Sequence, residues 1–229
     1  MRPFWLALGF LTTLPVPRAG RATPEELGKA APFFPLVGWV IGALLYGARL
    51  LLPGSEGVFA GLLLALWLLL TGMLHLDGLL DTADAVLAAR TPEARRQILA
   101  DVHLGSFAFG VGTLHLLLKS QAIAAAPAQA LLLAPVAARF WLLPLMNLFP
   151  AAKKAGLGAG AREGRWLMGL LFALPALWAA PQAFFIAGAG ALLLALFFAR
   201  RLGGLTGDTY GALIELTELV YLLVPAGAS

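Results

Sequence analysis

Hydrophobic and polar residues form long blocks along this chain, in which apolar runs of about 20 residues alternate with short polar connections. A run of that length, folded as an α-helix, spans the hydrocarbon core of a lipid bilayer. The runs occupy about seven segments, at residues 33–52, 58–76, 106–126, 128–149, 166–180, 182–199 and 210–224. The pattern therefore predicts an all-α, polytopic integral membrane protein with about seven transmembrane helices.

The first apolar stretch, residues 3–17, is too short to cross a bilayer and ends in Pro15-Val-Pro17. We expect a short re-entrant or interfacial segment with Phe4 and Trp5 at the level of the lipid headgroups. A small-residue cleavage site does not follow it, so we expect it to be retained. The chain has no internal repeat and no long linker, and we expect residues 1–229 to form a single membrane-embedded domain.

Basic residues occupy every second connection between the predicted spans. Lys and Arg precede the first span and follow the second, fourth and sixth, whereas residues 53–57 and the connections around Pro127 and Pro181 contain none. By the positive-inside rule the basic connections lie in the cytoplasm. An odd number of spans then places the N-terminus inside and the C-terminus outside.

Composition supports the membrane assignment and excludes other classes. Hydrophobic residues make up 60% of the chain and charged residues 12%, against about 25% charged in soluble domains. The net charge of +4 does not indicate nucleic-acid binding, because the basic residues sit in short spacers rather than on a stripe with interleaved aromatics. Cysteine is absent, which excludes disulfide and thiolate chemistry.

The strongest chemical signal is the sequence His75-Leu-Asp77-Gly-Leu-Leu-Asp81-Thr-Ala-Asp84, which holds three of the five aspartates of the chain. At about 100° per residue, positions i, i+4 and i+7 share one helix face, so the three carboxylates would repel one another unless a cation lay among them. All-oxygen ligands favour Mg²⁺ or Mn²⁺ over Zn²⁺. The alternative is a solvated first helical turn, where acidic residues are also favoured.

The acidic residues are predicted to gather on one side of the membrane. We expect Asp77 to end the second span and its helix to continue through Asp84 to about Ala89. Asp101 falls in the same cytoplasmic connection, and Asp208 precedes the last span on that side. The active-site motifs are therefore predicted to be cytoplasmic.

Five further polar residues lie inside the predicted spans: His115, Lys119, Arg139, Glu215 and Glu218. Each costs a few kcal/mol in lipid unless it is paired or faces a cavity. One interpretation is a set of buried salt bridges. For Lys119 and Glu218 the sequence does not decide between such salt bridges and a functional role. For Arg139 we favour a phosphate contact, because its planar fork matches phosphate oxygens. His115 is expected to be a hydrogen-bonded core histidine.

Glycines flank Asp208 in Gly203-Gly-Leu-Thr-Gly207-Asp208-Thr-Tyr-Gly211. Backbone N–H groups at a helix start, here at Gly207, can hold a phosphate. The alternative is a flexible turn between two spans. Gly38 and Gly42 form a different pattern, a GxxxG pair that is typical of close helix packing.

Taken together, these motifs resemble the cobalamin synthase family of adenosylcobinamide-GDP ribazoletransferases, and the resemblance covers the whole chain. It rests on the acidic motif at 75–84, on 203–209, and on Gly211-Ala-Leu-Ile-Glu215-Leu-Thr-Glu218. Shorter matches are Phe10-Leu-Thr-Thr-Leu-Pro-Val-Pro17, Phe34-Pro35-Leu-Val-Gly38, Asp101 and Leu104-Gly105-Ser106. Beside Asp101 the chain has Val102-His103 where Ser-Arg is common in the family.

The resemblance implies a Mg²⁺-dependent phosphotransferase of the cell inner membrane, of the EC 2.7.8 class. A hydroxyl of α-ribazole, or of its 5′-phosphate, would attack adenosylcobinamide-GDP to give adenosylcobalamin, or its 5′-phosphate, and GMP. Asp77, Asp81 and Asp84 would hold the metal. Asp208 would act as a further ligand or as the base, and His75 or His103 could be the base instead. The predicted substrate-binding residues are Arg90, Asp101, Arg139, Gly207, Glu215 and Glu218, and Arg95 and Arg96 would add positive charge.

Two alternatives come from different classes. A CDP-alcohol phosphotransferase also uses spaced aspartates at the cytoplasmic end of a span, but here glycine follows Asp77 and the arginine of that pattern is missing. A cation transporter would carry carboxylates on broken helices near the midplane, in repeated halves. The expected partners are the two small-molecule substrates and the bilayer; the sequence does not decide between a monomer and a homo-oligomer.

Overall fold

The computed structural model describes residues 2–17, 23–51, 56–88, 91, 94–95, 98–99, 103–152 and 166–226. Within these ranges the elements are helices, apart from an isolated bridge between Ala151 and Leu205, so the all-α prediction is confirmed. The elements are α1 (Arg2–Leu11), α2 (Pro24–Ala30), the 3₁₀ helix η1 (Ala31–Phe33), α3 (Phe34–Leu51), α4 (Glu56–Thr71), α5 (Leu74–Leu87), α7 (Ser106–Ala125), α8 (Ala128–Leu148), α10 (Trp166–Ala179), α11 (Pro181–Leu202) and α12 (Gly207–Ala226).

Among the described residues, four helical stretches are long and apolar enough to cross a membrane: Pro24–Leu51, α7, α8 and α11. A fifth is added if α4 and α5 count as one bent span. The predicted count of about seven spans is therefore not confirmed. α10 has 14 residues, about 21 Å of helix against a hydrocarbon core of about 30 Å. α12 has 20 residues but carries Asp208, Glu215 and Glu218, and most of its side chains are buried by other helices.

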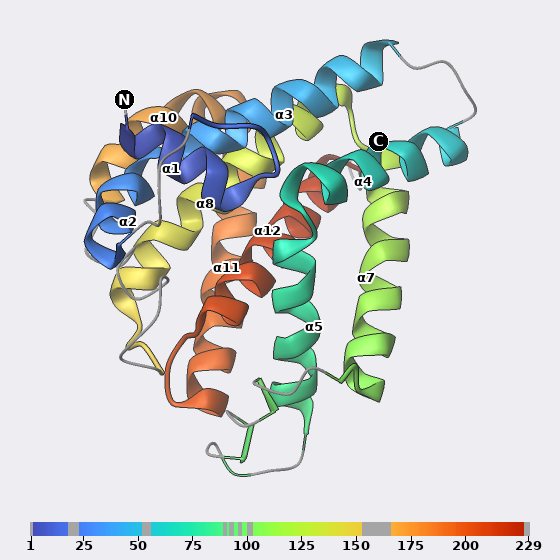
Figure 1. Cartoon of the computed structure of the whole chain (residues 1–229). Helices are drawn as coiled ribbons and strands as arrows, with labels where there is room; N and C mark the ends of the chain where they lie inside the picture. The colour runs from blue at the N-terminus through green and yellow to red at the C-terminus, as the bar shows by residue number, and fades with distance from the viewer. Residues whose placement is uncertain are drawn as a thin grey trace.

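The second predicted span is broken. The sequence predicted one helix from Val58 through Asp84 to about Ala89, whereas the chain bends by 91° between α4 and α5. In Figure 1, α4 lies across the upper part of the molecule and α5 runs down from it beside α7. The prediction of a continuous helix was wrong because the apolar run continues through a local turn.

Two residues in the left-handed conformation make this turn: Gly72 and Met73, each with a φ of 58°. Gly72 N–H donates to the Leu69 carbonyl (3.1 Å) and Met73 N–H donates to the Leu68 carbonyl (2.9 Å). These are the two hydrogen bonds of a Schellman helix end, which favours glycine because positive φ costs it no steric clash. Asp77 N–H then donates to the Met73 carbonyl (2.9 Å), so α5 begins immediately after the turn.

The N-terminal segment, residues 2–17, forms hydrogen bonds with the end of α4 at this turn. α1 is a helix of 10 residues that packs on α2 and α3, consistent with the expectation that it is too short to cross a bilayer. Beyond it, Thr13 N–H donates to the Leu70 carbonyl (2.8 Å), and the Thr13 hydroxyl donates to the Leu69 carbonyl (2.8 Å). The Leu70 carbonyl, which the end of α4 would otherwise leave open, thereby gains a donor, and the Leu69 carbonyl, which already accepts from Gly72, takes a second hydrogen bond.

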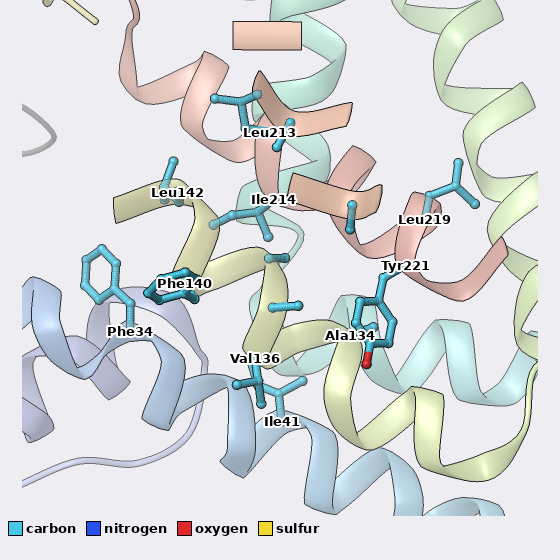
Figure 2. Packing of buried hydrophobic residues seen from close by; sticks show 14 of the residues in the cluster. Phe34, Ile41, Ala134, Val136, Phe140, Leu142, Leu213, Ile214, Leu219 and Tyr221 are labelled. Carbon is cyan, nitrogen blue, oxygen red and sulfur yellow. The ribbon is translucent and has the colours of Figure 1, made fainter. Parts of the chain in front are cut away.

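The apolar core is centred on α8, which packs against both α3 and α12 (Figure 2). The contact with α3 passes through the predicted small-residue pair. A Cβ atom on Gly38 would lie 2.6 Å from the Pro135 carbonyl oxygen, and one on Gly42 would lie 2.8 Å from the Leu132 carbonyl carbon. The two backbones therefore touch at these glycines, as the GxxxG spacing predicted.

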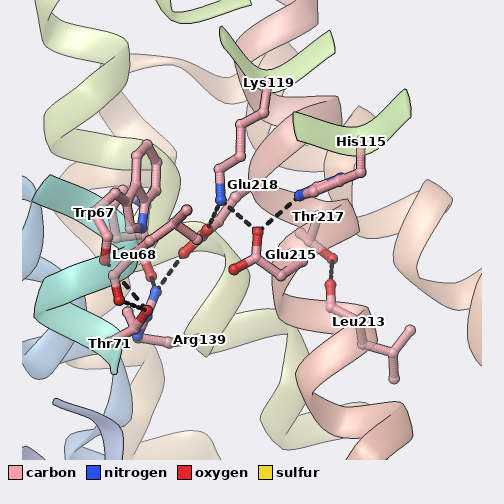
Figure 3. A network of polar contacts seen from close by, with 11 residues as sticks. Trp67, Leu68, Thr71, His115, Lys119, Arg139, Leu213, Glu215, Thr217 and Glu218 are labelled. Atoms are coloured by element: carbon pink, nitrogen blue, oxygen red, sulfur yellow. Dashed lines mark hydrogen bonds and ion pairs between the residues drawn. The ribbon is translucent and has the colours of Figure 1, made fainter. Parts of the chain in front are cut away.

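The five polar residues predicted inside the spans form one buried network (Figure 3). Lys119 Nζ on α7 donates to Glu215 Oε2 (2.6 Å) and to Glu218 Oε2 (2.7 Å), both on α12. Arg139 Nη1 on α8 donates to Glu218 Oε1 (2.7 Å), and His115 Nε2 lies 2.9 Å from Glu215 Oε2. The side chains are 0–2% exposed. The network balances two carboxylates with two fixed cations and ties α12 to both neighbours.

Lys119 also contacts α4, because its Nζ lies 4.3 Å from the centroid of the Trp67 ring. Its ion pairs with Glu215 and Glu218 decide between the alternatives that the sequence left open: Lys119 belongs to a set of buried salt bridges. Arg139 belongs to the same set rather than to an exposed phosphate site, since its side chain is 0% exposed and also donates to the Pro135 carbonyl (3.1 Å).

We expect Gly42→Leu to destabilise the protein by more than about 2 kcal/mol, because the new side chain would force α3 away from the α8 backbone. Gly47→Leu is the matched control on the same helix, since a Cβ there meets nothing within 4 Å. Both substitutions raise helix propensity by the same amount, so the difference between the two unfolding midpoints reports the packing of α3 on α8. Thermal unfolding of the two variants in one detergent measures it; equal midpoints would contradict the close crossing of α3 and α8.

We expect Glu218→Gln to cost about 3–5 kcal/mol, because it leaves the buried Arg139 and Lys119 short of a countercharge. Glu25→Gln is the control: Glu25 pairs with Lys29 at the same 2.7 Å, but both side chains are exposed, and little change is expected. Unfolding midpoints in detergent compare them. The network would not be a stabilising element if both variants unfolded at the wild-type temperature.

Candidate functional site

The three aspartates of the acidic motif lie on one helix, as predicted. Asp77, Asp81 and Asp84 all belong to α5, so the spacing i, i+4, i+7 places them on a common face. Asp77 is exposed, and Asp81 and Asp84 are half-buried. The fourth ionisable side chain of α5, His75, is buried.

A fourth aspartate joins this face from the far end of the chain. The charges of Asp77, Asp208 and Asp84 all act on the Asp81 carboxyl group. Asp208 is half-buried in the first turn of α12. Asp81 therefore lies within electrostatic range of the other three, whereas Asp101 lies outside the described residues; that the aspartates gather on the cytoplasmic side stays a prediction. Neighbouring carboxylates repel one another, and a cation among them would relieve that repulsion.

Glycines bring the two motifs together. A Cβ atom on Gly78 of α5 would lie 2.6 Å from the Asp208 carbonyl oxygen and 3.2 Å from the Gly211 Cα. A Cβ atom on Gly211 of α12 would lie 3.2 Å from the His75 Cα. The helix backbones therefore meet where each motif carries a glycine. The sequence analysis gave Gly78 and Gly211 no role in helix packing, although a glycine inside each acidic motif was the available signal.

Threonines set the position of Asp208. The Thr206 and Thr209 side chains cap the start of α12 reciprocally: Thr206 N–H donates to Thr209 Oγ1 (2.8 Å), and Thr209 N–H donates to Thr206 Oγ1 (3.3 Å). The Thr206 hydroxyl also lies within hydrogen-bonding distance of Asp208 Oδ2 (3.3 Å). Gly207, the predicted phosphate contact, is exposed at this helix start, and a Cβ there would meet nothing within 4 Å.

Asp84 makes contacts that the sequence did not predict. Its Oδ2 accepts a hydrogen bond from Gly105 N–H (2.7 Å), and its Oδ1 accepts one from Ala108 N–H (2.9 Å). Both oxygens of this carboxylate thus bind the beginning of α7. Its role as a metal ligand stays a prediction.

His75 lies away from the acidic face. It is two residues before Asp77, about 200° around the helix, and is only 2% exposed. The charges of Arg139, Glu215 and Lys119 act on it, which places it near the buried network rather than among the carboxylates.

The remaining predicted substrate contacts are not gathered at this face. Glu215, Glu218 and Arg139 form the buried network, and none of them has more than 1% of its side chain exposed. Arg90 and Asp101, with Arg96, lie outside the described residues. Arg95 is buried and donates through Nε (3.1 Å) and Nη2 (3.0 Å) to the carbonyl of Ala88, just beyond α5.

The carboxylates suit a hard divalent cation by their chemistry. Within the described part of the chain, however, groups of three or more His, Asp or Glu side chains already arranged to hold one ion are absent. Mg²⁺ does not need such a cage, because it retains several waters and is commonly held by one or two carboxylates together with substrate phosphates. The carboxylates of this face thus match the ligand chemistry of Mg²⁺, and magnesium binding stays a prediction.

Comparison with known proteins assigns the chain to a family. Residues 3–226 match the family model described as cobalamin-5-phosphate synthase. A protein of Deinococcus radiodurans is 48% identical over 225 residues, which cover 95% of this chain and 82% of the relative. A protein of Desulfitobacterium hafniense is 41% identical over 97% of this chain and 96% of its own length.

A third relative, from Pseudomonas aeruginosa, is 42% identical over 99% of this chain and 98% of its own length. All three relatives are named adenosylcobinamide-GDP ribazoletransferase. Solved structures give no significant match. Because the family model and these relatives cover nearly the whole chain, the protein belongs to the cobalamin-5-phosphate synthase family and is a transferase of cobalamin synthesis.

Proposed function

We propose that the protein is an adenosylcobinamide-GDP ribazoletransferase. A hydroxyl group of α-ribazole, or of α-ribazole 5′-phosphate, attacks the phosphate next to the aminopropanol arm of adenosylcobinamide-GDP. A new P–O bond forms, the bond from that phosphate to GMP breaks, and GMP leaves. The product is adenosylcobalamin or its 5′-phosphate. The reaction transfers a substituted phosphate group, which corresponds to the EC 2.7.8 class.

The observation that carries this proposal is the contact of α5 with α12 at Gly78 and Gly211. It joins the acidic motif to Asp208, although more than a hundred residues separate them in the chain. Phosphoryl transfer requires positioned phosphates and neutralised charge more than covalent help from the protein. A face of four carboxylates beside a helix start supplies both a cation site and backbone donors for a phosphate.

Asp77 and Asp81 would hold the Mg²⁺, since both lie on the open side of α5 and Asp77 is exposed. The bound ion would neutralise the diphosphate and stabilise the charge that develops on the leaving GMP. Two carboxylates with substrate oxygens and water make a suitable ligand set for this cation.

Asp208 is the proposed base for the proton of the attacking hydroxyl. It shares the acidic face, and the Thr206 hydroxyl fixes one of its oxygens. His75 is the weaker candidate, because a base must reach the proton it removes and His75 is 2% exposed on the other side of α5.

The proposed location is the cell inner membrane, with the chain passing several times and the acidic face on the cytoplasmic side. The alternation of basic and uncharged connections supports this orientation. It would place the site where nucleotide-activated substrates are available.

The first test is GMP release by the detergent-purified protein, given adenosylcobinamide-GDP, α-ribazole and Mg²⁺, with and without EDTA. We expect release that requires both substrates and stops when EDTA removes the metal. A folded sample that releases no GMP, but transfers phosphoryl groups from CDP-alcohols or moves divalent ions into liposomes, would overturn the proposal.

Two variants separate the proposed roles. Asp81→Asn should lower the rate of transfer by roughly 100-fold or more, because it removes a metal ligand. The protein should stay folded in membranes. Asp208→Asn should lower kcat by about 10²–10⁴-fold without changing the Mg²⁺ concentration for half-maximal activity. Glu56→Gln, an exposed carboxylate at the start of α4, is the control and should keep wild-type activity. Full activity of Asp81→Asn at saturating Mg²⁺ would show that the metal is held elsewhere.

A further inference from the structure

The carboxylate of Asp84 bridges two helices at one edge of the acidic face. It leaves α5 and reaches the beginning of α7, where its two oxygens take separate backbone donors: Gly105 N–H at 2.7 Å and Ala108 N–H at 2.9 Å. Each oxygen is therefore oriented by a different N–H group. Neither Asp77 nor Asp81 has a hydrogen bond of this kind among the described contacts of the chain.

α7 needs this contact because its own N-cap residue is Gly105, which has no side chain to accept a hydrogen bond. The first four N–H groups of an α-helix have no partner within the helix, and the helix dipole makes that end attractive to a negative charge. Asp84 supplies both the acceptors and the charge. It does from another helix what an Asp or Ser at the N-cap position usually does locally.

The shape of the chain at Gly105 fits the same contact. A Cβ atom there would lie 2.6 Å from Asp84 Oδ2 and 2.7 Å from its carboxylate carbon, well inside van der Waals contact. Any larger residue at this position would push the carboxylate away from the helix start. Glycine thus weakens the local N-cap and at the same time leaves room for the distant carboxylate that replaces it.

We propose that Asp84 is a positioning residue, which fixes the start of α7 and the loop His103–Gly105 beside the acidic face, and that Asp77 and Asp81 hold the metal without it. The kinetic part of this inference rests on the proposed function; the structural part does not. Within the motif Asp77-x-x-x-Asp81-x-x-Asp84, the third carboxylate then serves the protein scaffold and the first two serve the ion.

The position of α7 matters for the rest of the site. The helix is held at its start by Asp84 on α5 and in its middle by the ion pairs from Lys119 to α12. α5 and α12 are the two helices that meet at the acidic face. α7 therefore contacts both helices of the acidic face, α5 through Asp84 and α12 through Lys119, and these contacts fix the position of α5 relative to α12.

A double-mutant cycle tests the contact independently of metal and activity. Asp84→Ala and Gly105→Ala should each lower the midpoint of thermal unfolding in detergent, by roughly 3 °C or more. The two losses should not add, because both remove the same contact, and the cycle cancels any intrinsic effect of alanine at the N-cap position. Additive losses, or no loss in Asp84→Ala, would overturn the inference.

Binding of Mn²⁺ to the purified variants, followed by electron paramagnetic resonance without substrate or with inorganic pyrophosphate, tests the division of roles. Asp84→Ala and Gly105→Ala should bind Mn²⁺ within about 2-fold of wild type, whereas Asp81→Ala should weaken binding by at least about 10-fold. Loss of Mn²⁺ binding in Asp84→Ala as large as in Asp81→Ala, with Gly105→Ala unaffected, would make Asp84 a ligand and overturn the inference.

Kinetics give the readout that a general loss of stability would not. At a temperature where all variants are folded, Asp84→Ala should raise the KM for adenosylcobinamide-GDP several-fold and leave the Mg²⁺ concentration for half-maximal activity unchanged. Asp84→Asn, which retains one acceptor oxygen, should recover part of the KM. A wild-type protein without transferase activity would refute the proposed function alone, since the thermal cycle would still decide whether Asp84 anchors α7.

Discussion

Direct backbone contact between α5 and α12 is the constraint on which the site depends. Two helices approach this closely only where neither carries a side chain, and Gly78 and Gly211 provide that place. The contact sets which residues face one another: a shift of one residue along either helix would rotate its side chains by about 100° and separate Asp208 from the carboxylates of α5. Carboxyl groups that repel one another stay together only if the surrounding helices are rigid.

The buried network supplies that rigidity. α12 carries Asp208 at its start and the two glutamates further along, so the same helix belongs both to the candidate site and to the polar core. Buried charges are costly in an apolar environment unless they are paired, and the observed arrangement of α7, α8 and α12 pairs Lys119 and Arg139 with the two glutamates. The cost of separating these helices is therefore high, and the rotation of α12 is well defined. Specificity of assembly, rather than stability alone, is what such a network contributes.

The sequence predicted the parts of this protein that follow from local pattern. Apolar runs indicated the helices, and the spacing of Asp77, Asp81 and Asp84 indicated a shared face, because both depend on helix geometry alone. What could not be predicted depends on contacts between distant segments. The choice of Glu218 rather than a phosphate as the partner of Arg139, and the use of Asp84 by the α7 backbone, require that three helices already be in place. The break at Gly72 was missed for a related reason, since its flanking residues remain apolar and the Thr13 that supports it is far away in the chain.

The break between α4 and α5 separates two properties that a continuous helix would link. Because α4 ends in its own hydrogen-bonded turn and α5 starts anew from Met73, the length of α4 and the placement of the acidic residues are independent. Residues added near Glu56 would lengthen α4 at its first turn without moving any carboxylate of α5. A residue added between Asp77 and Asp81 would leave the apolar helix intact and turn part of the acidic face away from α12. The length of the apolar helix and the arrangement of the acidic face can thus change separately, on opposite sides of Gly72.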